Sequence, residues 1–133
     1  MEWSAPFDLD WQDDPLPHEG GGTITRDVLR NPLRGGPRWL MVYTAKDGRP
    51  ETAARRSIGV AVSDDALSWR RLQDDPVFHV GRHGAWDSGG AANPRLGVTP
   101  RDLRLYYYGW AGKGPPGPPA RGLGRAIPPG GDL

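Results

Sequence analysis

The chain has 133 residues, enough for one domain, and its 17 Lys plus Arg against 16 Asp plus Glu leave a formal charge of +1. This balance lacks the positive surface by which nucleic acids and anionic membranes are bound, so neither is an expected partner. There is no cysteine, and the three histidines are not spaced as zinc ligands, so we expect no metal site and no other cofactor.

Twenty Gly and 15 Pro oppose long helices, while six Trp and four Tyr are too many for a disordered chain. An all-β fold with turn-rich loops is therefore predicted. The first residues, Met1 to Asp8, lack the basic and apolar parts of a signal peptide, and no stretch approaches the roughly 20 apolar residues of a membrane span. The expected location is cytoplasmic by default, without a membrane partner.

Aromatic and β-branched runs bounded by Gly, Pro and Asp predict the strands in chain order. They lie at Trp39–Thr44, Ile58–Ser63, Leu67–Leu72 and Leu103–Tyr108. Asp64-Asp65 is a turn signal between the second and third of these strands. The segment Gly112–Pro119 is rich in Gly and Pro without a sustained triplet period, and it predicts a loose hairpin loop.

The chain repeats itself at a spacing of roughly 60 residues. Four pairs of segments match: Asp8 to His18 with Ala66 to His79, Asn31-Pro32 with Asn93-Pro94, Leu40–Ala45 with Leu105–Trp110, and Ser57–Val62 with Gly122–Ile127. We therefore expect one incomplete domain: the tail of one unit and a linker in 1–18, a complete unit in 19–79, and a truncated unit in 80–133.

Three or four short strands in such a unit are the content of one propeller blade. Solenoid repeats, the main rival, are much shorter. The prediction is a partial β-propeller of about two four-stranded antiparallel blades with Gly/Pro-rich loops. A propeller covers its blade faces by closing the ring, so two blades alone should leave two apolar sheet faces bare. We expect marginal stability or self-association through these faces.

The segment Ser57–Trp69, SIGVAVSDDALSW, resembles a blade signature of the five-bladed propellers in the arabinanase, levansucrase and invertase superfamily of glycoside hydrolases. WDSGGAANP at Trp86–Pro94, followed by Leu105–Trp110, resembles another unit of the same family. The resemblance covers about Asp8 to Ile127 and indicates the fold more specifically than the activity. It implies a funnel that binds carbohydrate, in which two carboxylates hydrolyse a glycosidic bond.

The family resemblance also implies an acidic residue early in each innermost strand, often as Asp-Pro. The corresponding positions here are Asn31 and Asn93, and an amide cannot act as base or nucleophile. Both are predicted to bind substrate, and hydrolysis at these two blades is not expected. Asp87 and Asp27 are the candidate catalytic carboxylates. The alternatives are a turn-closing role for Asp87 and a loop ion pair for Asp27, which follows Arg26.

Trp86 and Trp110 are candidates for stacking on a sugar ring, and His83 for a hydrogen bond at the funnel rim. Packing is the alternative for Trp110, and an exposed loop position is the alternative for His83. Trp11 and Trp69 occupy equivalent repeat positions and are predicted to be packing residues.

The run from Trp11 to Pro15 also resembles the nucleophile box of invertases. Because Asp13-Asp14-Pro15 recurs as Asp74-Asp75-Pro76, a repeated inter-blade turn is the better interpretation. Three functions remain open. The chain is a part of a glycosidase-like protein whose missing acids lie on other blades, a non-catalytic carbohydrate-binding or scaffold propeller, or a truncated product without function.

Overall fold

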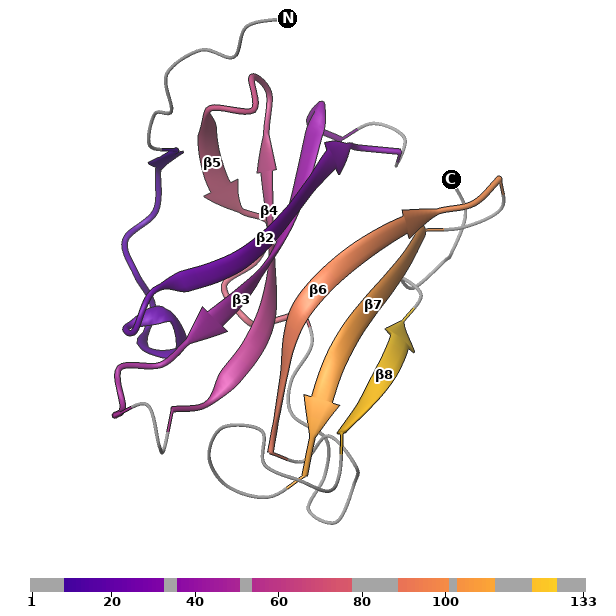
Figure 1. Cartoon of the computed structure of the whole chain (residues 1–133). Coiled ribbons are helices and arrows are strands. Elements are labelled where there is room, and N and C mark those ends of the chain that lie inside the picture. Colours follow the sequence, from indigo (N-terminus) through magenta and orange to yellow (C-terminus); the bar gives the residue numbers. More distant parts are fainter. Residues whose placement is uncertain are drawn as a thin grey trace, which may run out of the picture.

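The computed structural model of the chain describes residues 9–32, 36–50, 54–77, 89–100, 103–111 and 121–126. These residues form two β-sheets and one short 3-10 helix (Figure 1). The predicted all-β, partial-propeller fold is confirmed. Within this described part, no helix has the length and hydrophobicity needed to cross a membrane.

The first sheet has the strand order β1-β5-β4-β3-β2, and the second has the order β6-β7-β8. The elements are β1 (Asp10–Trp11), η1 (Pro17–Glu19), β2 (Thr23–Arg30), β3 (Trp39–Lys46), β4 (Arg56–Ser63), β5 (Ser68–Arg71), β6 (Gly90–Val98), β7 (Leu103–Trp110) and β8 (Arg121–Ala126). Strands β2 to β5 pair antiparallel, as predicted for one blade, and β1 adds to this sheet in parallel with β5. All four predicted strands are present, as β3, β4, β5 and β7.

Strand β3 lies at the centre of the core because both of its faces are apolar. Its side chains alternate between the two faces of the sheet. Met41 and Tyr43 pack with Trp69 on one face, whereas Leu40 packs against Leu103 of the second sheet on the other. The second sheet therefore covers one face of the first.

The opposite face of the first sheet was expected to be bare, and this expectation is wrong. Met41 and Trp69 are fully buried there, and Tyr43 is 1% exposed. Trp11 and Trp39 pack against them, and the Trp11 and Tyr43 rings meet edge to face with centroids 5.3 Å apart. Trp11 and Trp69 are thus packing residues, as predicted. For the second sheet, an open face that supports self-association stays a prediction.

The turn between β4 and β5 is built as the Asp64-Asp65 signal predicts. The Asp65 carboxylate accepts hydrogen bonds from the N–H groups of Leu67 (2.8 Å) and Ser68 (2.9 Å), and the Ser63 hydroxyl accepts one from Ala66 N–H (2.9 Å). These contacts hold Ala66 at a φ of 64°. The donors of Ser68 and Leu67 lower the pKa of Asp65, because they stabilise its charged form.

Candidate functional site

The innermost strands of the two sheets are β2 and β6. Each is the edge strand of its own sheet, and the two lie against each other where the sheets meet (Figure 1). In a propeller the innermost strands line the central channel, where ligands bind. The candidate site is therefore sought along this seam.

Each innermost strand contains one bulge residue with a left-handed backbone. The pairing of β2 with β3 is shifted at Thr25, and the pairing of β6 with β7 is shifted at Asn93. Their φ angles are 42° and 54°, and both side chains are exposed. Such a conformation is strained for a β-branched residue and easier for Asn. Bulges of this kind re-aim side chains and are frequent next to functional sites.

Within its bulge, Asn93 lies opposite Tyr107, which matches Val42 in the repeat, and the residue of β2 that pairs with Val42 is Asp27. Asp27 is therefore the structural counterpart of Asn93, and the predicted equivalence of Asn31 and Asn93 is wrong. Asn31 lies just beyond the end of β2, and its side-chain amide donates a hydrogen bond to the Pro37 carbonyl (2.9 Å). Its N–H donates to the Arg38 carbonyl (2.8 Å). The match rested on the Asn-Pro dipeptide, whereas strand pairing defines the equivalence. The geometry gives Asn31 a loop-closing role.

Asp27 lies within β2, half-buried, and not in a loop. Its carboxylate accepts a hydrogen bond from the N–H of Leu96 on β6 at 2.7 Å. The guanidinium of Arg26 donates instead to the carbonyl and hydroxyl of Thr23. Asp27 therefore joins the two innermost strands, and this contact replaces the ion pair considered from the sequence.

Thr44 of β3 is a site residue that sequence reasoning missed. Its hydroxyl oxygen lies 2.6 Å from the Thr25 hydroxyl oxygen and accepts a hydrogen bond from the N–H of Asn93 at 3.0 Å. The structure thus brings Asp27, Asn93, Thr25 and Thr44 together at the seam. Carboxylate, amide and hydroxyl groups offer both donors and acceptors to a ligand. Among the described residues, no group of three or more His, Cys, Asp or Glu side chains is arranged to hold a metal ion.

The other predicted site residues are not part of this arrangement. Asp87, Trp86 and His83 lie outside the described residues. Trp110, at the end of β7, is 2% exposed, and a Cβ atom at Gly90 on β6 would overlap its indole ring. The Trp110 ring therefore packs over the second sheet, which agrees with the packing alternative.

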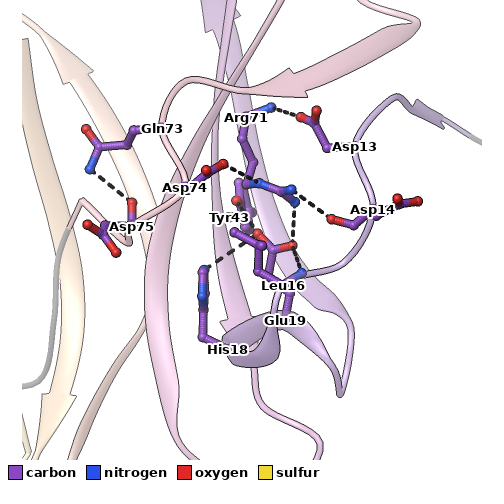
Figure 2. Close-up of polar contacts among 10 residues, drawn as sticks. All are labelled: Asp13, Asp14, Leu16, His18, Glu19, Tyr43, Arg71, Gln73, Asp74 and Asp75. Carbon is purple, nitrogen blue, oxygen red and sulfur yellow. Dashed lines mark hydrogen bonds and ion pairs between the residues drawn. The ribbon is translucent and has the colours of Figure 1, made fainter.

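A second polar cluster surrounds the buried carboxylate of Glu19, in η1 (Figure 2). One oxygen accepts a hydrogen bond from the Arg71 guanidinium at 2.7 Å, and the other accepts one from the Tyr43 hydroxyl at 3.0 Å. His18 lies 3.6 Å from the same carboxylate, and the N–H of Leu16 donates to it at 3.3 Å. Burial of the phenol, and then the negative charge of Glu19, raise the pKa of Tyr43.

Arg71, on β5, contacts both copies of the Asp-Asp-Pro repeat. Its N–H donates to the Asp13 carboxylate (2.6 Å), and its guanidinium donates to the Asp14 carbonyl (2.7 Å). The Asp74 carboxylate lies 3.7 Å from its Nε. Both copies thus lie beside the outer strand β5, not at the innermost strands. This placement supports a repeated turn over an invertase-like nucleophile.

The Glu19 cluster joins three parts of the chain that are distant in sequence, namely η1, β3 and β5. Because both carboxylate oxygens accept hydrogen bonds and the side chain is 2% exposed, we interpret the cluster as structural. It fastens residues 10–22, here called the N-terminal strap, onto the face of the first sheet.

Two stacked sheets that meet at bulged innermost strands define the chain as part of a β-propeller. No family model and no curated protein matches the chain. Two solved structures match it, one described as a BT0996 RGII complex and the other as a glycoside hydrolase. Each has a TM-score of 0.56 at 23% identity, over 73% of this chain and 27% of the other. The chain thus spans about a quarter of these structures, and the likeness shows a shared fold.

Proposed function

We propose that the chain is part of a carbohydrate-binding propeller and that the sugar contacts Thr25, Asp27 and Asn93. The observation that carries this proposal is the pair of exposed bulge residues on neighbouring innermost strands, joined through one buried hydroxyl. Strained backbone that persists in two adjacent strands points to a function beyond packing.

The chemistry of these groups suits a polyhydroxylated ligand. A sugar hydroxyl donates one hydrogen bond and accepts others, so its site needs paired donors and acceptors. The Asn93 amide and the Thr25 hydroxyl supply both, and the Asp27 carboxylate supplies acceptors. The fold shared with a glycoside hydrolase and an RGII complex is further support. A five-bladed, arabinanase-like ring, as the blade motifs indicate, is the proposed context.

We propose binding rather than hydrolysis for the described residues. Hydrolysis by the usual mechanism requires two carboxyl groups on either side of the glycosidic bond. Asp27 is the one acidic residue within β2 and β6, and one of its carboxylate oxygens already accepts a hydrogen bond from the Leu96 N–H. A hydrolase is the alternative, in which Asp87, with Trp86 and His83 in the same segment, provides the second acid.

The test uses the full 133-residue chain with oligosaccharides from arabinan and inulin, and with RGII. We expect saturable binding by calorimetry, weakened about tenfold in Asn93→Ala, the equivalent of roughly one hydrogen bond. Asn31→Ala is the matched control and should retain wild-type affinity. We expect no release of reducing sugar.

Three outcomes would contradict this proposal. If Asn93→Ala binds the sugar as tightly as the wild type does, the Asn93 bulge is not part of the binding site. Release of reducing sugar that is lost in Asp87→Asn would select the hydrolase. Absence of cooperative unfolding in the purified chain would favour a product without function.

A further inference from the structure

We infer that Thr44 is the positioning residue of this site: its buried hydroxyl holds both bulge residues, Thr25 and Asn93, in the geometry in which they face the ligand. This inference rests on the proposed carbohydrate site and assigns a role to a residue that does not touch the ligand.

Thr44 has no exposed surface, and it lies on β3, one strand away from the innermost position. A hydroxyl has one proton and two lone pairs. One lone pair accepts the Asn93 N–H (3.0 Å), and the close contact with the Thr25 hydroxyl (2.6 Å) uses the proton or the second lone pair. The Thr44 hydroxyl therefore contacts both Thr25 and Asn93, and it affects a ligand only through the positions of these two residues.

The bulge makes this contact necessary for Asn93. The register of β6 and β7 shifts between Ala92 and Arg95, so no residue of β7 pairs directly with Asn93, and its N–H donates to the Thr44 hydroxyl instead. A buried or half-buried backbone N–H without a partner is strongly unfavourable, and a left-handed residue persists only when its surroundings fix it. The Thr44 hydroxyl supplies an acceptor for this N–H at the bulge. It reaches Asn93 from the first sheet, so the conformation of one blade depends on a side chain of its neighbour.

A second hydrogen bond joins the two sheets, so the role of Thr44 can be tested while the sheets stay together. The Asp27 carboxylate on β2 accepts a hydrogen bond at 2.7 Å from the N–H of Leu96, which lies on β6 as Asn93 does. Apolar contacts of Leu40 and Val62 with Leu103 hold the two sheets together independently. Removal of the Thr44 hydroxyl should accordingly release Asn93 and leave the seam intact.

The experiment compares Thr44→Val, which keeps the shape but loses the hydroxyl, with Thr44→Ser, which keeps the hydroxyl. Amide hydrogen exchange is measured by NMR in the full chain at Asn93, with Leu96 as the internal reference. We expect exchange at Asn93 to accelerate at least about tenfold in Thr44→Val, with Leu96 unchanged and Thr44→Ser close to wild type. Sugar affinity should fall about tenfold in Thr44→Val alone.

The inference is overturned if Asn93 stays protected in Thr44→Val, or if Thr44→Ser exchanges as fast as Thr44→Val. It is also overturned if Asn93 is already unprotected in the folded wild type, a measurement that holds even if Thr44→Val does not fold. If the wild type binds none of the sugars while the exchange pattern is as expected, the proposed function fails and the contact role of Thr44 stands. If sugar binds and Thr44→Val binds it equally, only the positioning role fails.

Discussion

Trp11 and Trp69, which occupy equivalent positions in two sequence repeats, lie directly opposite each other in the parallel strands β1 and β5. Hydrogen bonds from Asp10 N–H to the Leu67 carbonyl (2.9 Å) and from Gln12 N–H to the Trp69 carbonyl (2.8 Å) fix this pairing. Because the two copies run side by side, the segments that follow them both reach Arg71. The N-terminal strap thereby becomes part of the first sheet, and its fastening should control the stability of that sheet.

The first prediction concerns Glu19→Gln. The substitution removes the buried charge opposite Arg71, whose side chain is 6% exposed, and leaves that guanidinium without a buried counter-charge. Loss of one partner of a buried ion pair costs about 3 kcal/mol or more, so the free energy of unfolding in urea should fall by this order. Asp74→Asn is the control, since Asp74 is 87% exposed, and it should change little. Equal effects of the two variants would show that the Glu19 pair does not stabilise the strap.

The second prediction is a loss of stability at alkaline pH through Tyr43. Its pKa is raised in the folded protein, mainly by burial and by Glu19. The folded state therefore holds this proton more tightly than the unfolded state, in which Tyr titrates near about pH 10. The stabilisation is complete below about pH 10 and is lost as the pH rises further.

Urea unfolding between about pH 8 and about pH 11.5, on either side of the ordinary Tyr pKa, checks this prediction. The wild type should lose stability more steeply than Tyr43→Phe, which has no phenolic proton at this position. Parallel pH profiles of the two proteins would rule out Tyr43 as the source of the alkaline transition.

The third prediction uses the close approach of β3 and β4. A Cβ atom at Gly59 would overlap the phenol ring of Tyr43, which is held by Trp11 and Glu19 and cannot move freely. Gly59→Ala should lower the free energy of unfolding by about 1–3 kcal/mol, as is usual for overpacking. Gly48→Ala is the matched control, since the nearest atom to its added Cβ would be 3.7 Å away. A Gly59→Ala variant as stable as Gly48→Ala would contradict the packing.

The fourth prediction concerns acid pH and the turn at Asp65. The N–H groups of Ser68 and Leu67 lower the pKa of this carboxyl, so the folded state favours its charged form. The resulting stabilisation is present above about pH 4, the range in which Asp is charged in the unfolded chain, and is lost as the pH falls further. Asp65→Ala should be less stable at neutral pH and should lose less stability on acidification than the wild type.

Thermal unfolding at about pH 7 and about pH 3, on either side of the ordinary Asp pKa, measures this difference, with Asp64→Ala as the control. Asp64 is exposed in the same turn, and its variant should keep the acid dependence of the wild type. If both variants behave alike, the turn is not stabilised by the Asp65 carboxylate.

The strands predicted from the sequence are those with apolar or aromatic runs, and the structure contains all four. The bounds of the innermost strands β2 and β6 were not predicted from the sequence, and the reason is physical. TITRDVLR in β2 is largely exposed, and GAANPRLGV in β6 contains Gly, Asn and Pro, which are rare in regular strands. Bulged edge strands lack the alternation by which a strand is recognised.

The candidate site was predicted in part. Asp27 and Asn93 were identified as candidates, and the structure brings both to the seam. Thr25 and Thr44 were not, because their contact with Asn93 depends on how two sheets meet, which no local pattern encodes. The buried Glu19 was missed because its neighbours, Pro17, His18 and Gly20, are typical of an exposed loop.

Strand β6 contributes only main-chain groups to the two polar ties across the seam, the N–H of Asn93 and the N–H of Leu96, whereas the first sheet contributes the Thr44 and Asp27 side chains. A main-chain donor survives any substitution except proline. Substitution at positions 93 and 96 therefore leaves both donors in place, although residue 93 must still accept a left-handed backbone and residue 96 must still pack against the Leu40, Val62 and Leu103 cluster. The two side chains that form these hydrogen bonds thus both belong to the first sheet, and the second sheet contacts them with its backbone.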